Sequence, residues 1–328
     1  MDECYVLGID TSNYTTSVCV LDGSGAVRFD GRLLLDVKRG ERGLRQSEAL
    51  FQHVRHLPEL AEEMARKGVD LKKTAAVAAS VRPRPAPDSY MPVFLAGEGL
   101  GRSLAAGLQV PFYAVSHQEG HLAAAEADVG DVPAASFLAA HVSGGTTDIL
   151  RVERKPGGYR IDTLGQSMDL HAGQLIDRVG VALGLPFPAG PALERLAQSL
   201  AGGDSGGIAL PVFVRGCSIS FSGPQTRALR WIEDGASPAQ VAMAVQRCVA
   251  RALEKALLHA LAEHEERHIL MVGGVASNAW IRHRLTHRLS HPAVGAVLHW
   301  AGPEYSRDNA RGVARLGLAA FREELNSV

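Results

Sequence analysis

The residues best suited to chemistry are two histidines and an aspartate from distant parts of the chain. His117 and His121 lie four positions apart at the start of a predicted helix, so both imidazoles share one face. Alone this pair is a weak signal, because the chain contains 13 histidines. Asp308, predicted at a loop-to-helix junction, would complete a set of two imidazoles and one carboxylate. Such a facial triad binds a divalent metal and leaves positions open for substrate oxygens.

A second feature is a sequence pattern that occurs twice, 131 positions apart. Residues 6–21 and 137–152 each contain an apolar run, a turn of small polar residues and a second apolar run, which predicts a β-hairpin. Exposed N–H groups and hydroxyls in such turns can bind phosphate oxygens. Ser12 in the first copy and Ser143-Gly144-Gly145 in the second are therefore candidates for the two sides of a nucleotide clamp. Two ordinary hairpins are the alternative, and the matched pair favours the clamp.

Two further positions are candidates for nucleotide contact. A predicted strand ends in Gly273-Gly274 before a helix, where backbone could approach a flat ring or a ribose and the Asn278 amide could hydrogen-bond it. A tight strand–helix turn is the competing interpretation. Asp177 could hold ribose hydroxyls, although its spacing alone favours a solvated acid on a helix.

The elements that must position these residues alternate between strand and helix. A length of 328 residues exceeds one comfortable core, which predicts two lobes. With the duplicated hairpin, the pattern predicts an α/β fold whose lobes, residues 1–128 and 129–305, share one topology. The helix within 306–328 is expected to pack back near a ligand cleft at the strand ends. Pro58 is expected to kink or split a helix that begins near Ser47.

Composition excludes several classes of protein. The chain is 46% hydrophobic and 21% charged, and no apolar run reaches the roughly 18 residues of a membrane helix. The acidic start, Met1-Asp2-Glu3, lacks the basic region of a signal peptide. The four cysteines are scattered without a CxxC pair, which indicates reduced thiols in a cytoplasmic protein.

The net charge of −1 means that any nucleic-acid surface must be a local patch. The segment Lys38–Arg45 carries four cations that could contact nucleic-acid phosphates, although a solvated loop is the more frequent case. The proline-rich segment Arg82–Pro87 is equally consistent with an acceptor-reading loop and with a stiff surface connection.

Together these motifs resemble the tRNA threonylcarbamoyladenosine transferase family, also labelled TsaD or Gcp. The resemblance extends over almost the whole chain. It implies an actin/hexokinase/Hsp70-like (ASKHA) fold with a nucleotide cleft between two duplicated lobes. The segments that carry it are LGIDTS (7–12), HQEGHL (117–122), VSGG (142–145), FPAGP (187–191), SFSGPQT (220–226), VGGVASN (272–278) and SRDNA (306–310).

The resemblance implies a metal- and nucleotide-dependent acyl transferase. The family's reaction moves a threonylcarbamoyl group from its mixed anhydride with AMP to N6 of adenosine 37 in tRNA, and AMP leaves. The implied cofactors are a divalent metal (iron or zinc, with magnesium as an option) and an adenine nucleotide. The implied partners are tRNA and either a paralogous subunit or a second copy of the chain. The family's metal ligands fall on His117, His121 and Asp308, and its nucleotide-site residues fall on Ser143, Gly144, Gly145, Asp177, Gly190 and Asn278.

Several positions depart from the family pattern, and no catalytic acid or base is assigned. Tyr14 and Thr15 replace an acidic pair, Thr146 replaces a histidine and Gln225 replaces a lysine. Three hypotheses therefore remain: threonylcarbamoyl transfer to tRNA, a carbamoyl-type transfer to another acceptor, or a non-catalytic nucleotide-binding partner in a tRNA-modification complex. A zinc protease is not supported, because HQEGH lacks the HExxH order.

Overall fold

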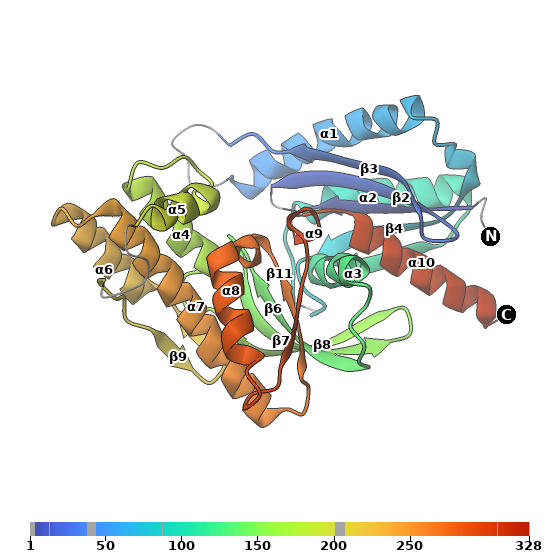
Figure 1. The fold of residues 1–328 in the computed structure, drawn as a ribbon. Coiled ribbons are helices and arrows are strands. Elements are labelled where there is room, and N and C mark those ends of the chain that lie inside the picture. Colours follow the sequence, from blue (N-terminus) through green and yellow to red (C-terminus); the bar gives the residue numbers. More distant parts are fainter. Residues whose placement is uncertain are drawn as a thin grey trace. The chain divides into compact units, whose positions relative to one another are not determined.

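The computed structural model describes residues 4–12, 14–37, 44–86, 88–200, 207–306 and 308–327, which form two compact units (Figure 1). The first unit comprises Met1–Gly130, Arg154–Arg160 and Arg307–Val328, so it is built from both ends of the chain. The second comprises Asp131–Glu153 and Ile161–Ser306. Most of the predicted basic segment Lys38–Arg45 lies outside the described residues, as does Pro87.

The first unit is a five-stranded sheet with helices on both faces. Its strands are β1 (Tyr5–Thr11), β2 (Thr15–Asp22), β3 (Val27–Leu34), β4 (Thr74–Arg82) and β5 (Phe112–Ser116). Its helices are α1 (Gln46–Arg66), α2 (Phe94–Leu108), α3 (His117–Val129) and α10 (Arg311–Asn326), with a short 3₁₀ turn, η1 (Leu71–Lys73).

The second unit contains a second five-stranded sheet and a set of helices packed on it. Its strands are β6 (Ser136–Val142), β7 (Thr147–Lys155), β8 (Gly158–Gln166), β9 (Phe213–Arg215), β10 (Ser218–Ser220), β11 (His268–Val272) and β12 (Val297–Trp300). Its helices are α4 (Ala172–Ala182), α5 (Gly190–Gln198), α6 (Ser222–Glu233), α7 (Pro238–Glu263), η2 (Gly274–Ser277), α8 (Ala279–Leu289) and α9 (Pro303–Ser306).

The two large sheets have the same topology. The strand order is β3-β2-β1-β4-β5 in the first and β8-β7-β6-β11-β12 in the second. In each, the first strand of the hairpin is antiparallel to the second and parallel to the strand on its other side. The hairpins close at Thr11–Thr16 and at Val142–Thr147, again 131 positions apart. The predicted duplicated hairpin is therefore confirmed.

Alternating side chains of the first sheet divide between two layers of core. Leu7 and Ile9 pack with residues of α1 and α2, whereas Val6 packs with the alanine face of α10. Gly8 lies under α10, where an added Cβ would fall 2.5 Å from the backbone nitrogen of Ala314. The sequence thus places glycine where a helix rests directly on a strand.

A single large core holds the second unit together, with α7 at its centre. Alanine, valine and leucine side chains of α7 pack between the sheet and helices α4, α5, α6 and α8. In the first unit, α1 continues through Pro58, so the expected split of this helix is wrong, whereas the alternative of a kink at Pro58 stays a prediction. Pro58 is solvent-exposed, so water can satisfy the carbonyl that its missing N–H leaves free. Within the described residues, no helix is long and apolar enough to span a bilayer.

Candidate metal centre and nucleotide-binding residues

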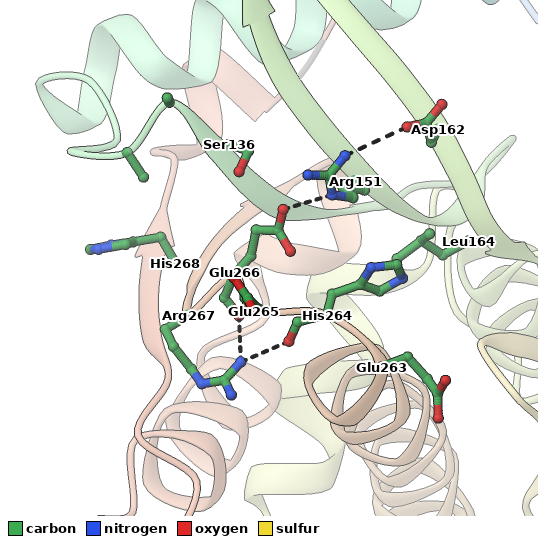
Figure 2. A pocket seen from close by; sticks show the side chains of 12 residues that line it. Ser136, Arg151, Asp162, Leu164, Glu263, His264, Glu265, Glu266, Arg267 and His268 are labelled. Atoms are coloured by element: carbon green, nitrogen blue, oxygen red, sulfur yellow. Dashed lines mark hydrogen bonds and ion pairs between the residues drawn. The ribbon is translucent and has the colours of Figure 1, made fainter.

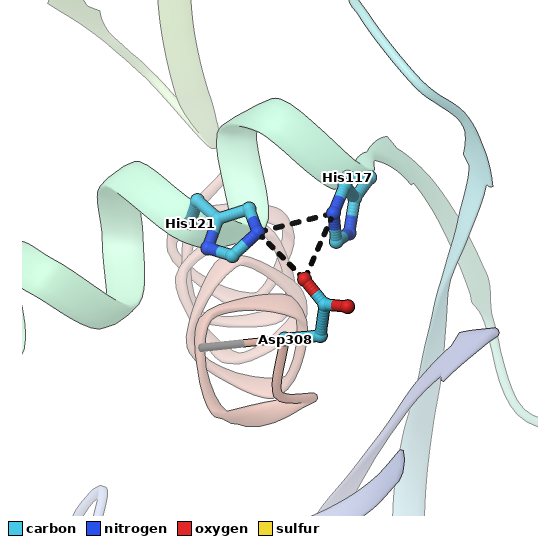
Figure 3. A group of neighbouring side chains, drawn as sticks. All are labelled: His117, His121 and Asp308. Carbon is cyan, nitrogen blue, oxygen red and sulfur yellow. Dashed lines mark hydrogen bonds and ion pairs between the residues drawn. The ribbon is translucent and has the colours of Figure 1, made fainter. Parts of the chain in front are cut away.

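The first unit brings together the three predicted metal ligands (Figure 3). The Nε2 atoms of His117 and His121 are 3.0 Å apart, and Oδ1 of Asp308 lies 3.6 Å and 3.3 Å from them. A metal about 2.1 Å from each ligand requires ligand–ligand separations of about 3.0–3.4 Å. Two of the three separations fall in this range, and the third, from His117 to Asp308, exceeds it by about 0.2 Å, so a small shift of Asp308 would let the three atoms bind one divalent ion. Among the described residues, this is the one group of three such ligands found.

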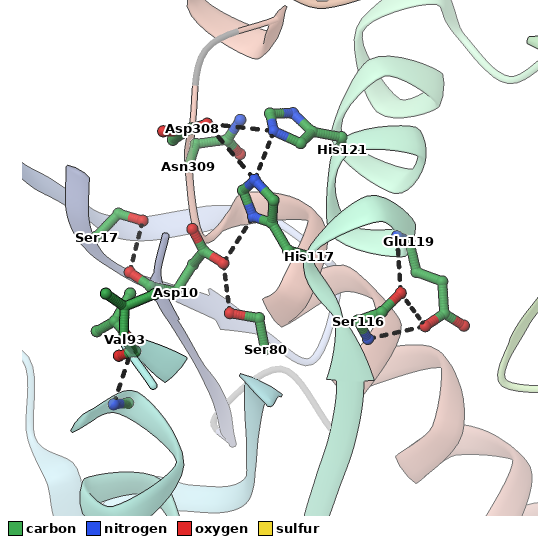
Figure 4. Close-up of polar contacts among 12 residues, drawn as sticks. Asp10, Ser17, Ser80, Val93, Ser116, His117, Glu119, His121, Asp308 and Asn309 are labelled. Carbon is green, nitrogen blue, oxygen red and sulfur yellow. Dashed lines mark hydrogen bonds and ion pairs between the residues drawn. The ribbon is translucent and has the colours of Figure 1, made fainter. Parts of the chain in front are cut away.

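The helix that carries both histidines begins at the first of them. Ser116 and Glu119 form a capping box: the Ser116 hydroxyl accepts a hydrogen bond from the Glu119 backbone N–H, and the Glu119 carboxylate accepts one from the Ser116 backbone N–H (Figure 4). The glutamate of the HQEGH motif is thus a helix cap. Because the helix starts at His117, the two imidazoles occupy one face of its first turns.

A crossing of two helices without side chains between them brings Asp308 to α3. A Cβ on Gly312 of α10 would fall 1.7 Å from the carbonyl oxygen of Gly120 of α3. At the start of α10, the Asn309 side chain accepts a hydrogen bond from the Arg311 N–H, and Arg311 forms an ion pair with Asp30 at 2.9 Å. These contacts set the loop that presents the third ligand.

A fourth residue, Asp10, orients the first ligand and was missed by the sequence reasoning. Its carboxylate lies 3.0 Å from Nδ1 of His117, is fully buried and accepts a further hydrogen bond from the Ser80 hydroxyl (Figure 4). A carboxylate on the far nitrogen of a metal-binding histidine fixes the tautomer whose lone pair faces the metal. The available signal was an acid at the end of the first apolar strand, in LGIDTS.

Opposite charges dominate the electrostatics of the centre. Burial disfavours the charged form of His117, but the charge of Asp10 and its hydrogen bond raise the pKa of His117 to about 9. Burial also opposes ionisation of Asp308, yet a hydrogen bond from His121 and the charges of both histidines hold its pKa well below its usual range. The buried hydroxyl of Ser12 acts in the same direction, so this predicted residue lies beside the metal ligands.

The predicted phosphate loop of the second unit is an exposed hairpin turn. Neither Gly144 nor Gly145 has a left-handed backbone, and a Cβ at either position would meet no atom within 4 Å. Neither internal packing nor backbone strain therefore requires glycine at these positions. The open space is what a bound anion would need for close approach to the backbone.

Two other glycines hold that loop in place. A Cβ on Gly173, in the first turn of α4, would fall 2.6 Å from the Ser143 carbonyl oxygen, and the Gly173 N–H donates to the same oxygen at 3.1 Å. Gly273, after β11, has a left-handed φ of +98° and would place a Cβ 2.3 Å from the carbonyl oxygen of Val142. The sequence reasoning missed the role of Gly173, because nothing in the sequence shows which backbone it contacts.

The remaining predicted nucleotide residues lie on or next to α4, α5 and α8, and two of them, Asp177 and Gly190, are close to each other. Burial raises the pKa of Asp177, whose carboxylate accepts a hydrogen bond at 2.7 Å from Ala189, the residue before Gly190. Asn278 caps α8 by accepting a hydrogen bond from the Ile281 N–H at 2.9 Å, and its Nδ2 donates to Gln246 at 2.6 Å. Each side chain thus supports the fold and has capacity for a ligand: the second carboxylate oxygen of Asp177 can accept a hydrogen bond, and the second amide hydrogen of Asn278 can be donated.

Comparison with known proteins identifies the family. The sequence signature described as "TsaD: tRNA N6-adenosine threonylcarbamoyltransferase" matches residues 38–314. The chain belongs to the TsaD family. A Thermus thermophilus protein named tRNA N6-adenosine threonylcarbamoyltransferase is 34% identical, over 98% of this chain and 93% of its own length. A Methanopyrus kandleri protein of the same name is 32% identical, over 93% and 86%.

Solved structures similar to this chain confirm the expected ASKHA fold. HypF from T. kodakarensis superposes with a TM-score of 0.61 at 17% identity, over 98% of this chain and 48% of that one. Component A of (R)-2-hydroxyglutaryl-CoA dehydratase from Acidaminococcus fermentans gives 0.58 at 15% identity, over 98% and 99%. The TsaD family consists of metal- and nucleotide-binding enzymes, and the ligand geometry of this chain agrees with that.

Some TsaD motif residues serve the fold of this chain. The carboxylate of Asp169 accepts hydrogen bonds from the hydroxyl of Ser220, at 2.5 Å, and from the N–H of Phe221, at 2.9 Å, just before α6 begins. These hydrogen bonds hold the pKa of Asp169 low against the opposing effect of its burial. Gln225, in place of the family's lysine, accepts a hydrogen bond from Arg178 at 3.1 Å.

A separate cavity of about 750 Å³ lies in the second unit, near the end of α7 and the start of β11 (Figure 2). It shares no residue with the candidate sites of this TsaD family member. Arg151 is paired with Glu266 at 2.6 Å and with Asp162 at 3.8 Å, and Arg267 donates to the carbonyl of His264 at 2.9 Å. These groups satisfy one another, so we assign the cavity no chemistry.

Proposed function

We propose that the chain transfers a threonylcarbamoyl group from threonylcarbamoyl-AMP to N6 of adenosine 37 in tRNA. The observation that carries the proposal is the assembly of His117, His121 and Asp308, with Asp10 behind the first of them, in a chain of the TsaD family. These three residues stand at the positions where the resemblance to the family places its metal ligands, which supports the proposal.

The three ligands would hold one divalent ion. Two imidazoles and one carboxylate suit iron or zinc better than magnesium, which prefers an all-oxygen set. When bound, such an ion supplies a Lewis acid that polarises phosphate or carbamate oxygens. Asp10 would hold the proton of His117 on Nδ1, so that the lone pair of Nε2 faces the ion. Because the raised pKa of His117 favours its doubly protonated form, metal binding would release the proton on Nε2.

The second unit would bind the adenylate. Ser143-Gly144-Gly145 offers backbone N–H groups and open space for phosphate, supported from below by Gly173. Asp177, Gly190 and Asn278 are proposed to contact the ribose or the base.

Association with a paralogous subunit or with a second copy of the chain remains a prediction. Light scattering of the purified chain, alone and with a candidate subunit, would test it.

A second candidate is a transfer of the same type to a different acceptor. Tyr14 and Thr15 stand where the family has an acidic pair, and Thr15 is buried in β2. If that pair supplies the base or orients the acceptor, its loss costs about 10²–10⁴-fold in rate. An enzyme whose acceptor needs no such base could lose the acidic pair and still retain the metal ligands and the adenylate-binding residues.

The deciding experiment incubates the purified, metal-loaded chain with threonylcarbamoyl-AMP and unmodified tRNA, followed by nucleoside analysis. Formation of the modified nucleoside supports the first candidate. Release of AMP without modified tRNA rejects it in favour of the second. The variant His117→Ala/His121→Ala should lose both metal and product, whereas His283→Ala/His287→Ala, a pair with the same spacing that is exposed on α8, should lose neither.

A further inference from the structure

Positive charge is concentrated on two neighbouring helices of the second unit, α7 and α8. Together they contain six lysine and arginine residues but only two acids, Glu254 and Glu263, in a chain whose net charge is −1. Glu263 is the last residue of α7, two turns beyond the nearest cation. The remainder of the chain is correspondingly acidic.

The cations lie on adjoining helix faces. On α7 they recur every fourth residue, at Arg247, Arg251 and Lys255, which places them in one row. On α8, Arg284 and Arg288 follow the same spacing, and the two helices pack against each other. We call these five residues the α7–α8 basic surface. Arg282 is excluded, because its guanidinium stacks over the Trp300 ring, 5.3 Å from the centroid.

One carboxylate lies among these five cations. Glu254 is nearly buried and binds Arg284 at 3.1 Å and Arg288 at 2.8 Å. Arg251 and Lys255 are exposed and form no ion pair with the described residues. Burial and the neighbouring charges of Arg284 and Arg251 lower the pKa of Arg247. The like charges therefore repel one another, and a bound anion would relieve that repulsion.

The surface also lacks the apolar anchors of a protein interface. No large exposed hydrophobic side chain among the described residues belongs to α7 or α8. Protein partners usually bind through buried aromatic or aliphatic side chains at the centre of the interface. Four of the five cations are arginines, whose planar fork binds phosphate oxygens in pairs.

We propose that the α7–α8 basic surface binds the phosphate backbone of structured RNA. The identification of that RNA as tRNA rests on the proposed function, whereas the charge and spacing of the five cations, and the exposure of Arg251, Lys255 and Arg288, do not. This surface is the local patch that a nearly neutral chain needs in order to bind a polyanion. Such contacts position the RNA without reading its sequence.

The test measures equilibrium binding of unmodified tRNA to the full chain over a range of salt concentrations, with no threonylcarbamoyl-AMP present. The variant Arg251→Gln/Lys255→Gln/Arg288→Gln removes three exposed cations and leaves Arg284 paired with Glu254. Binding at about 100 mM salt should weaken roughly tenfold or more, and the salt slope should fall by about one for each cation removed. The control variant Arg66→Gln/Lys72→Gln/Lys73→Gln makes the same change in net charge on the first unit and should bind nearly as wild type.

Binding of poly-glutamate, a polyanion without phosphate, is measured alongside tRNA. Three results would overturn the proposal: the α7–α8 variant binds tRNA as well as wild type does, both variants lose tRNA binding equally, or the α7–α8 variant loses binding of poly-glutamate but not of tRNA. The last result would identify the partner of this surface as an acidic protein. Circular dichroism and the metal content of each variant verify that it is folded. The assay is independent of the transferase reaction. If the chain binds tRNA through this surface but does not modify it, the RNA-binding proposal stands and the proposed function is rejected. If the α7–α8 variant still binds and modifies tRNA, the proposed function stands and the RNA-binding proposal is rejected.

Discussion

At the scale of single residues, buried polar side chains decide how the candidate sites work. Asp10 can affect metal binding without being a ligand, because its carboxylate holds Nδ1 of His117 and leaves Nε2 facing His121 and Asp308. The Ser80 hydroxyl holds Asp10 in turn. The metal centre therefore depends on residues from two further segments, β1 and β4, as well as on the ligands themselves.

Replacing Asp10 by asparagine should weaken metal binding about 10–100-fold, because the amide carries no charge to stabilise the ligand tautomer. Competition with a chromophoric chelator measures the affinity. Asp22→Asn is the matched control: Asp22 is also buried in the first unit, but it accepts hydrogen bonds from Ser24 and pairs with Arg28 in a hairpin turn. The control should lose stability and keep its metal affinity. Equal metal affinity in both variants would contradict the role of Asp10.

Replacing Gly144 by valine should abolish the stabilisation of the chain by AMP or ADP. The branched side chain would occupy the space through which phosphate approaches the backbone, yet it would meet no atom of the protein. Thermal unfolding with and without millimolar nucleotide measures the effect. The unfolding temperature without nucleotide should stay the same, which separates lost binding from lost folding. A full nucleotide response in this variant would place the phosphate elsewhere.

His53 predicts a pH dependence of stability. Burial lowers the pKa of His53 to about 4, so the folded chain resists a proton that the unfolded chain accepts near pH 6.5. Stability is then unaffected above about pH 6.5 and falls as the pH drops from there toward 4. The loss between pH 7 and pH 5 is about 2 kcal/mol. Urea unfolding of His53→Gln should show a smaller loss of stability between pH 7 and pH 5 than wild type, and His259→Gln, at an exposed site, is the control for replacing a histidine.

At the scale of elements, glycines determine which segments can meet. The ligands on α3 meet Asp308 only because Gly120 and Gly312 let α3 and α10 cross with their backbones in contact. The same logic recurs in the second unit, where Gly173 and Gly273 contact the backbone of the hairpin turn. Both candidate sites thus depend on close backbone approaches between elements far apart in the sequence.

Gly312→Ala should separate α3 from α10, cost about 3 kcal/mol of stability and weaken metal binding, because its Cβ would overlap the Gly120 carbonyl. The same substitution at Gly99 of α2 meets no atom within 4 Å and should stabilise the chain by about 0.5–1 kcal/mol. Chemical denaturation of both variants, with a metal titration, measures the two effects. A stable Gly312→Ala variant with normal metal affinity would show that the crossing does not control the site.

At the scale of the whole molecule, each unit has its own core and its own candidate site. The proposed metal belongs to the first unit and the proposed adenylate loop to the second. All three tryptophans (Trp231, Trp280 and Trp300) lie in the second unit. Tryptophan fluorescence therefore reports the unfolding of that unit alone.

Nucleotide should raise the unfolding temperature seen by tryptophan fluorescence, whereas metal should raise only a second transition that calorimetry detects. At 100 times its dissociation constant, either ligand stabilises its unit by about 2.7 kcal/mol. The double variant His117→Ala/His121→Ala should lose the metal response and keep the nucleotide response. A single transition that responds equally to both ligands would show that the units unfold together.

Much of this description follows from local sequence. Two apolar runs around a turn of small polar residues predicted the strands of each hairpin, and the repetition of this pattern predicted the common topology of the two sheets. The four-residue spacing of His117 and His121 predicted a shared helix face. By contrast, Asp10, Gly173 and Gly312 carry no periodic signal, because their roles depend on what another segment places against them.

The chain alone therefore determined the two hairpins, the order of strands and helices, and the residue types able to bind a metal and a phosphate. Only the tertiary structure decided that Asp10 lies behind His117, that Ser12 lies beside Asp308 and that the cations of α7 and α8 share one surface. Local periodicity is written into neighbouring residues, whereas contacts between distant segments depend on how helices and sheets pack, which no short stretch of sequence specifies.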